Sequence, residues 1–280
     1  MSTHVILNGR LMSGDGPVIS LDNRAFHYGD GVFESIRVLN GAPCFVDAHW
    51  TRLQEGLKVL RIETPAGLDP SSIVRMITEL SGACGLPNGR ARLTVYRDAP
   101  GYYRPRAHTG GYTIELHPVP TPNYALNLQG HTVDIYPEMR KPVNMLAVHK
   151  TLNCQIYVMA SLWCMERGLD DCLLQNDRGN IIESSSGNLF IVSNGVLYTP
   201  SLSDGCIGGV MRMQVINLAI ANGIKVYECS LNPQNLLAAD ELFFTNAARG
   251  VQWVSAYRPK RYAHRMAQHL TGLLVARVLS

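Results

Sequence analysis

The sequence lacks the features that mark several classes of protein. Its 280 residues contain no apolar run approaching the roughly 20 residues that span a bilayer, and no internal repeat or low-complexity segment. Charged residues amount to only 17%, and the net charge of +3 arises from basic residues dispersed along the chain. Dispersed charge argues against nucleic acid as a partner. The N-terminal residues become polar too early for a signal peptide, so we expect a cytoplasmic protein without a membrane partner.

The cysteines show no pattern of a metal site or a disulfide framework. There are seven, an odd number, and none lies in a CxxC or CxxxH spacing. Cys154, Cys164 and Cys172 stand inside apolar runs. This distribution predicts buried free thiols in a reducing compartment and no bound metal.

The composition supports a large core in one or two domains, because 46% of the 280 residues are hydrophobic. Residues 117–123 carry three prolines in seven positions, which is typical of a linker between domains. We expect a smaller N-terminal α/β domain over residues 1–119, a linker over 120–128 and a larger domain over 129–280.

Local signals predict several of the elements. Asn-Gly pairs at 8–9, 40–41 and 194–195 predict two-residue hairpin turns. Asp47 is expected to cap one helix, and Asp69-Pro70 to begin another. Alternating or apolar runs predict strands over 90–97, 112–116, 132–136 and 171–175, and a helix over 262–278.

Two residues suggest chemistry. Lys150 precedes an apolar run with helical spacing, and burial among such neighbours favours the nucleophilic amine over the ammonium form. Glu183 ends one apolar segment just before Asn188 begins the next, and a carboxylate there could keep a pyridine nitrogen protonated. Taken without their context, the two residues are more typical of a surface lysine and a solvated hairpin glutamate.

The sequence around both residues resembles that of the fold-type IV pyridoxal-phosphate enzymes. The matching pattern is Lys150-x-Leu-Asn153 followed by Glu183-(x)4-Asn188-Leu-Phe. This family includes branched-chain aminotransferase, D-amino-acid aminotransferase and aminodeoxychorismate lyase, and the similarity runs from about Asn8 to about Val254. It implies a two-domain α/β (α+β) fold with a larger C-terminal pseudo-barrel domain. It also implies pyridoxal 5'-phosphate attached to Lys150, amino acid and 2-oxo acid substrates, and a homodimer.

The resemblance assigns further residues to the cofactor. Arg52 matches the phosphate-binding arginine, and a guanidinium suits a phosphate through its parallel donors. The glycine-rich turn before residue 210 matches a second phosphate cradle, in which Val210 and Met211 donate main-chain N–H groups. Met211 stands where most transaminases of the group have threonine. Asn188 and Asn246 complete this expected set, and a solvated helix arginine stays open as the alternative for Arg52.

The resemblance also assigns residues to the substrate. The segment Leu21–Val38 matches the one that brings Tyr28, Ser35 and Arg37 to the substrate side, although in isolation it fits a structural turn. Ala247 matches a turn beside the substrate carboxylate. Arg97, with Arg92 nearby, lies close to the position of a substrate-binding cation, but the loop at 98–110 departs from the family patterns and leaves a strand-edge arginine open.

Three functions remain open from the sequence. The expected catalytic residues are Lys150, Tyr28 and Ser35, and the first function is a transaminase acting on branched-chain-like amino acids. The second is an aminodeoxychorismate lyase making 4-aminobenzoate and pyruvate. Ser35 and Asn246 favour the lyase, and Glu34 argues against it. The third is a non-catalytic binding protein with the same fold. The sequence leaves the amino donor and its L or D preference undecided.

Overall fold

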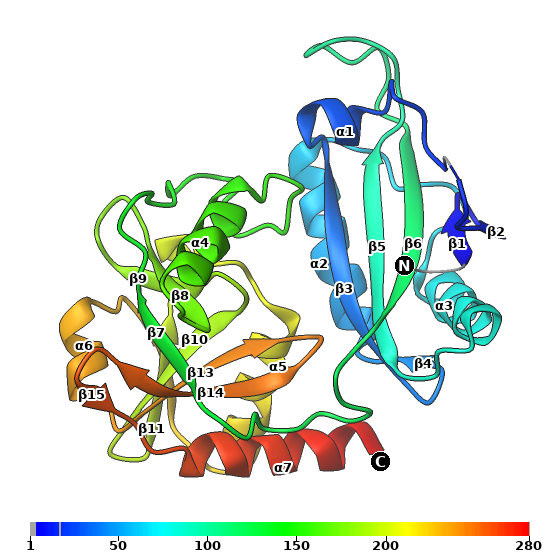
Figure 1. The fold of residues 1–280 in the computed structure, drawn as a ribbon. Coiled ribbons are helices and arrows are strands. Elements are labelled where there is room, and N and C mark those ends of the chain that lie inside the picture. Colours follow the sequence, from blue (N-terminus) through cyan, green and yellow to red (C-terminus); the bar gives the residue numbers. More distant parts are fainter. Residues whose placement is uncertain (1–3, 17, 280) are drawn as a thin grey trace. The chain divides into compact units, whose positions relative to one another are not determined.

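The computed structural model describes residues 4–16 and 18–279, which form a mixed α/β protein of two compact units (Figure 1). The first unit contains the chain up to Asn123 together with His149–Asn153, and the second contains Tyr124–Val148 and the chain from Cys154 onward. The boundary between Asn123 and Tyr124 therefore falls inside the predicted linker, while the domain limits expected from the sequence stay a prediction. No helix in the described part of the chain has the length and apolarity needed to cross a membrane.

The first unit is built on an antiparallel six-stranded sheet in the order β2-β1-β6-β5-β3-β4. Its strands are β1 (His4–Leu7), β2 (Arg10–Ser13), β3 (Gly31–Leu39), β4 (Ala42–Pro43), β5 (Gly89–Arg97) and β6 (Gly110–Pro118). Its helices are α1 (Arg24–Tyr28), α2 (Val46–Leu60) and α3 (Pro70–Cys84). Ile36 of the sheet, Leu53 of α2 and Ile77 of α3 belong to one buried apolar core. One face of the sheet is thus covered by α2 and α3.

The second unit contains a closed barrel. Its strands are β7 (His131–Ile135), β8 (Asp171–Gln175), β9 (Ile181–Ser184), β10 (Asn188–Ser193), β11 (Val196–Pro200), β12 (Val226–Cys229), β13 (Glu241–Asn246), β14 (Gly250–Tyr257) and β15 (Lys260–Arg261). The path β10-β13-β14-β7-β8-β9 returns to its start because β9 also pairs with β10. Glu183 opposite Asn188 is the register pair that closes it. The pseudo-barrel expected for this part of the chain is confirmed.

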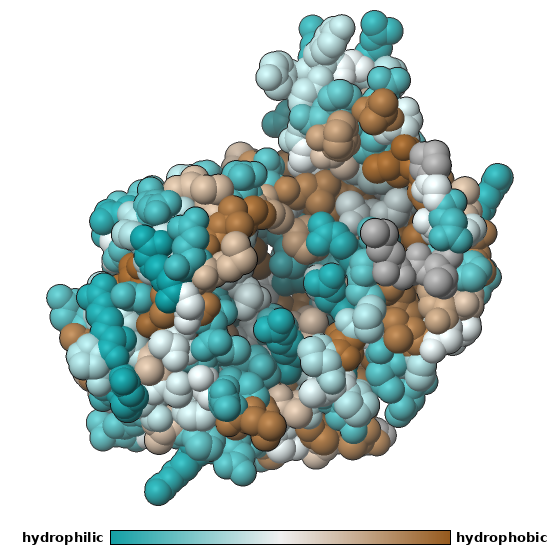
Figure 2. Space-filling view, viewed as in Figure 1, coloured by the Kyte–Doolittle hydropathy of each residue, from teal (hydrophilic) through white to brown (hydrophobic). Residues whose placement is uncertain are grey.

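The second unit has four α-helices in the described residues: α4 (Gln155–Glu166), α5 (Val210–Ala221), α6 (Pro233–Ala238) and α7 (Arg265–Leu279). Helix α4 is apolar on its outer side as well, where Val158, Leu162 and Met165 are exposed. The face of the molecule in Figure 2 shows such hydrophobic side chains scattered among hydrophilic ones.

The cysteines all lie in the described part of the chain, and none of the seven forms a disulfide there. The thiols of Cys164, Cys172 and Cys206 are buried, as expected for the first two. Cys154 is only partly buried, because it stands just before the first residue of α4.

The hairpin turns predicted from Asn-Gly pairs are confirmed. Both residues of each pair have positive φ, with values of 46° and 82° at 8–9, 49° and 82° at 40–41, and 49° and 75° at 194–195. These angles match the twist that two-residue hairpins need. The prediction that Asp69-Pro70 begins a helix is also confirmed, because α3 starts at Pro70 and the Asp69 carboxylate caps it by accepting from the Ser72 N–H at 2.7 Å.

The expected cap at Asp47 is wrong. The cap of α2 is Phe45, two residues earlier, and its φ of 56° turns the chain out of the preceding hairpin. Asp47 lies in the first turn instead, where its charge still favours the helix N-terminus.

Candidate active site

In the first unit, Lys150 is attached to the sheet through its main chain. Its carbonyl accepts from the Phe33 N–H at 3.0 Å, and the Leu152 N–H donates to the Gly31 carbonyl at 2.9 Å. A Cβ at Gly31 would lie 2.4 Å from the Val95 carbonyl oxygen, so only glycine permits this close approach. The amine of Lys150 lies over the Phe33 ring, 4.3 Å from its centre. Lys150 is therefore held at β3 rather than on a free surface loop.

The face of the sheet that carries Phe33 is polar. Ser35 lies two residues further along β3, on the same face, and pairs with Arg92 of β5. The guanidinium of Arg92 lies over the Phe33 ring, 3.9 Å from its centre. Phe33 thus brings the amine of Lys150 and the guanidinium of Arg92 onto one aromatic ring, close to the half-buried hydroxyl of Ser35. Phe33 was not among the residues expected from the sequence.

Arg97 lies elsewhere in the first unit and serves a structural network. Its guanidinium donates to Asp30 at 3.0 Å and to the carbonyls of Leu60 and Arg61 at 2.7 and 2.8 Å. These contacts do not support the substrate role expected for Arg97. The alternation of β5 explains the difference, because Arg97 follows the core-facing residues 91, 93 and 95, whereas Arg92 lies on the face of Phe33.

Arg52 is held by a buried carboxylate. Its Nε donates to Glu34 Oε1 at 2.8 Å and its Nη2 to Glu34 Oε2, while His49 Nδ1 lies 2.6 Å from Oε2. Burial alone would raise the pKa of Glu34, but the charge of Arg52 and the contact with His49 lower it to about 2. Burial lowers the pKa of His49, whose buried Nε2 has no partner among the described residues. Glu34 therefore fixes the plane of the guanidinium, whose five N–H donors suit a phosphate.

In the second unit, Glu183 is 2% exposed, which excludes a solvated hairpin glutamate. Its Oε1 accepts from Lys141 Nζ and from the Tyr157 hydroxyl, each at 2.7 Å. Its Oε2 accepts from the Ile207 N–H at 2.8 Å. The side-chain amide of Asn188 donates to the carbonyl of the same Ile207 at 2.7 Å. The two residues of the closing pair therefore bind both main-chain groups of Ile207.

The turn between Glu183 and Asn188 is organised by Asp171 of β8. The hydroxyls of Ser184, Ser185 and Ser186 donate to its carboxylate at 2.9, 2.5 and 2.7 Å. The N–H of Ser185 adds a bond at 3.1 Å. Asp171, which is 4% exposed, thus holds three small polar residues in one fixed turn conformation.

The start of α5 provides the elements of an anion site. Gly209, the cap of α5, offers no side chain to the first N–H groups, which include those of Val210 and Met211. A Cβ at Gly209 would lie 1.8 Å from Asn188 Oδ1, so this corner requires glycine. The buried hydroxyl of Thr245, opposite Asn188 in register, has no partner among the described residues. Unpaired donors at a helix start fit a phosphate group, so this corner suits the phosphate of pyridoxal phosphate.

The remaining predicted residues are placed as follows. Asn246 Oδ1 accepts from the Arg249 N–H at 2.9 Å and Nδ2 donates to the Ser186 carbonyl at 3.2 Å, so its side chain shapes the turn that contains Ala247. Tyr28 ends α1 and packs on Tyr103, with ring centres 5.4 Å apart. Arg37 is buried and donates to the Thr121 carbonyl at 2.5 Å.

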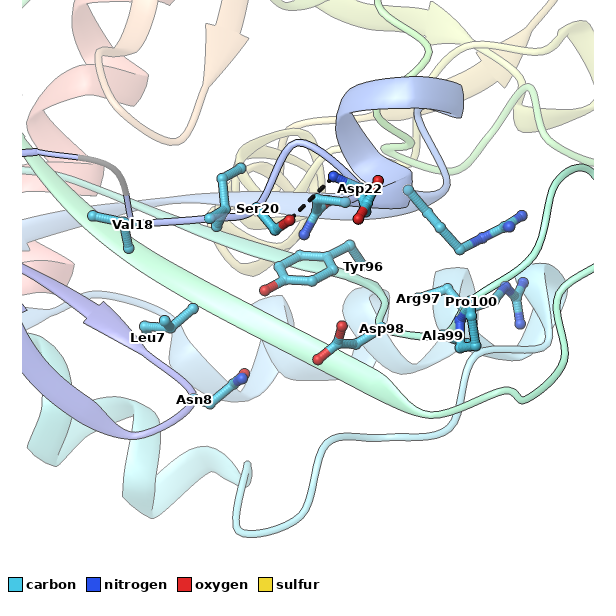
Figure 3. Close-up of a pocket in the computed structure, with 13 residues that line it drawn as sticks. Leu7, Asn8, Val18, Ser20, Asp22, Tyr96, Arg97, Asp98, Ala99 and Pro100 are labelled. Carbon is cyan, nitrogen blue, oxygen red and sulfur yellow. Dashed lines mark hydrogen bonds between the residues drawn. The ribbon is translucent and has the colours of Figure 1, made fainter.

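A separate cavity of about 360 Å³ lies in the first unit (Figure 3). The end of β1, residues 18–24 and the end of β5 form its walls, and Figure 3 shows Tyr96 and Asp98 facing Ser20 and Asp22 across it. Neither Lys150, Ser35 nor Arg52 lines this cavity. It is therefore distinct from the polar face beside Phe33.

The chain matches a known family over most of its length. The model of the family described as amino-transferase class IV covers residues 31–257. A Methanocaldococcus jannaschii protein assigned to the branched-chain-amino-acid aminotransferases is 32% identical over 245 residues, which cover 87% of this chain and 84% of that protein. The aminodeoxychorismate lyase of Bacillus subtilis is 28% identical over 253 residues, covering 87% and 83%. The chain belongs to the class IV aminotransferase family, as its motifs predicted.

A solved structure agrees with this assignment. The branched-chain aminotransferase of the thermophilic archaeon Thermoproteus uzoniensis, crystallised with norvaline, superposes with a TM-score of 0.89 and 26% identity. The match covers 100% of this chain and 95% of that one. The protein is thus an enzyme of the aminotransferase type, within a family that also contains lyases of the same fold.

Replacing Glu34 by Gln should destabilise the protein in a pH-dependent manner. Because the pKa of Glu34 falls from 4.5 in the unfolded chain to about 2 in the folded one, its stabilisation is complete above pH 4.5 and is lost as the pH falls towards 2. At about 1.4 kcal/mol per pKa unit, the difference in unfolding free energy between wild type and Glu34→Gln should shrink by about 2 kcal/mol between about pH 5 and about pH 3. Chemical denaturation measures it, with exposed Glu55→Gln as the control. A pH-independent difference would contradict the assignment.

Replacing Gly209 by Ala should disrupt the corner at the start of α5. The new Cβ would displace the Asn188 amide from Ile207, which should cost about 1–3 kcal/mol in unfolding free energy. Gly82→Ala is the matched control, because no atom lies within 4 Å of a Cβ at that helical position. Alanine there should stabilise the protein by up to about 1 kcal/mol. Equal effects of the two variants in thermal unfolding would show that the corner tolerates a side chain.

Proposed function

We propose that the protein is a pyridoxal-phosphate-dependent transaminase that transfers the amino group of an amino acid to a 2-oxo acid. The observation that carries the proposal is the buried carboxylate of Glu183, because its Oε2 accepts one hydrogen bond in the described chain and retains one acceptor position. That position suits the protonated ring nitrogen of the cofactor. Bound pyridoxal phosphate supplies an electron sink that stabilises negative charge at the substrate Cα.

Lys150 has two tasks in this proposal. Its Nζ would hold the cofactor covalently and, once the amine of the substrate has displaced it, would be free to accept a proton from the substrate Cα and to return that proton. Its main-chain bonds to Phe33 and Gly31 keep the amine in one place, which favours such a short proton transfer.

The phosphate would be bound by donors from separate elements. Arg52 offers a guanidinium whose plane is fixed by Glu34, and the N–H groups of Val210 and Met211 offer a helix start. The hydroxyl of Thr245, which has no partner among the described residues, supplies the donor that Met211 cannot. Asn246 contributes by shaping the adjoining turn.

The substrate carboxylate would be bound by Arg92, which shares the face of Phe33 with Lys150. Tyr28, Arg37 and the turn at Ala247 stay predicted substrate contacts. Branched-chain amino acids are the proposed donors, in line with the aminotransferase relatives. The exposed rings of Tyr102 and Tyr103 support the proposed homodimer, since aromatic side chains are enriched at interfaces. A cytoplasmic location is proposed with it.

Aminodeoxychorismate lyase is the second candidate, and the position of Ser35 favours it. The hydroxyl lies on the face of β3 that carries Phe33, and thus on the side of the Lys150 amine. A hydroxyl there could relay a proton during elimination.

Replacing Lys150 by Ala should abolish turnover and the visible absorbance of the bound cofactor, because the amine that binds it is lost. The fold should persist, since the bonds from residues 149–153 to β3 involve main-chain atoms. Absorbance spectra with circular dichroism measure both properties, and exposed Lys225→Ala is the control. Covalent trapping of the cofactor by borohydride on any lysine other than Lys150 would contradict the assignment.

Replacing Ser35 by Gly should separate the two candidate functions. In a transaminase, the hydroxyl is dispensable and amino-group transfer should stay within a few-fold of wild type. In a lyase, loss of the relay should reduce 4-aminobenzoate formation by about 10²–10⁴-fold. Assays of both reactions with L- and D-amino acids and with aminodeoxychorismate decide the question. Lyase activity in a wild type that transfers no amino group would exclude the transaminase.

A further inference from the structure

The carboxylate of Glu183 is constrained on one oxygen more than on the other. Oε1 accepts from Lys141 and Tyr157, which fills both of its acceptor positions, whereas Oε2 accepts, among the described residues, from the Ile207 N–H alone. All three donors belong to the second unit. Glu183 can therefore offer one hydrogen-bond position to a ligand, and that position is on Oε2.

The two side chains on Oε1 are themselves fixed. The N–H of Lys141 donates to the Gln175 carbonyl at 2.9 Å and its carbonyl accepts from the Asp177 N–H at 3.2 Å, so the main chain of Lys141 is tied to the end of β8. Lys141 and Glu183 form an ion pair in which both side chains are buried. Tyr157 comes from the first turn of α4. Burial, and then the charge of Glu183, raise the pKa of Tyr157, so its hydroxyl stays protonated and donates.

We propose that Lys141 and Tyr157 are positioning residues that occupy Oε1 of Glu183, so that Oε2 alone meets the ring nitrogen of the cofactor. The inference rests on the proposed function. It assigns a role to two residues that the motifs of the chain did not indicate. In the sequence, Tyr157 lies within the apolar run of a helix, and Lys141 belongs to no motif. Without these donors, the carboxylate can rotate and its free acceptor position is no longer directed.

A purely structural role of the same contacts makes a different prediction. If Lys141 and Tyr157 only held the barrel and α4 together, their loss would weaken binding of any cofactor-shaped ligand. If they act through Glu183 on the ring nitrogen, only ligands that possess this nitrogen should be affected. An analogue of pyridoxal phosphate with C–H in place of the ring nitrogen separates the two cases.

The experiment measures the affinity of apoenzyme for pyridoxal phosphate and for this analogue by equilibrium dialysis. Tyr157→Phe removes one hydrogen bond to a charged group, and should weaken binding of pyridoxal phosphate about ten-fold. Binding of the analogue should change by less than about two-fold by the same reasoning. Tyr136→Phe is the matched control, because Tyr136 lies in the same buried cluster and its hydroxyl faces Glu138 instead of Glu183. This control should bind both ligands as the wild type does.

The Lys141 variants make the test independent of Tyr157. Lys141→Met should weaken the binding of pyridoxal phosphate by at least about ten-fold and leave the binding of the analogue unchanged. Lys141→Arg, which keeps the charge and the donors, should recover most of the lost affinity. Equal weakening of both ligands, or no weakening of either, would overturn the positioning role. A wild type that binds the analogue and not pyridoxal phosphate would also overturn it. A wild type that binds neither ligand would instead overturn the proposed function.

Discussion

The second unit depends on the pairing of Glu183 with Asn188, because this pair closes the ring of strands. The same two side chains bind the N–H and the carbonyl of Ile207, just before the start of α5. Asp171 holds the corner between them through three serine hydroxyls. Closure of the barrel, orientation of the carboxylate and placement of the helix start are thus one constraint. A change that weakens the pairing of Glu183 with Asn188 must therefore disturb the barrel closure, the carboxylate and the helix start together.

Each unit contains a buried carboxylate that is paired with a cation. Glu34 holds Arg52 and His49 in the first unit, and Glu183 holds Lys141 in the second. Burying a charge is unfavourable unless it is paired and hydrogen-bonded, and both carboxylates meet this condition. In the proposed function, the ligand-binding group is the cation Arg52 in the first unit and the carboxylate of Glu183 in the second. Pairing thus serves to orient a functional group in both units, in addition to compensating its charge.

Turns and strands could be predicted because their causes are local. Asn-Gly pairs and the alternation of β5 determine their structures within a few residues, and the motifs around Lys150 and Glu183 identify the family. Short elements such as α1 and α6 were missed because a periodic pattern needs more than one turn to show. Lys141 and Tyr157 could not be found, because their partner Glu183 is distant in sequence. Arg97 was expected to bind the substrate, although the alternation of side chains along β5 places it on the same side as the core residues 91, 93 and 95.

The segment of residues 149–153 has a consequence for dividing the chain. It lies between the two stretches of chain that form the second unit, yet its main chain is bonded to β3 of the first, through Phe33 and Gly31. A cut at the linker would therefore yield a C-terminal fragment that carries the lysine without the strand that orders it. The N-terminal fragment would keep an edge of β3 with unpaired N–H and carbonyl groups, which invites association with other chains. Separate expression of the two halves would consequently produce a complementation pair rather than two self-sufficient domains.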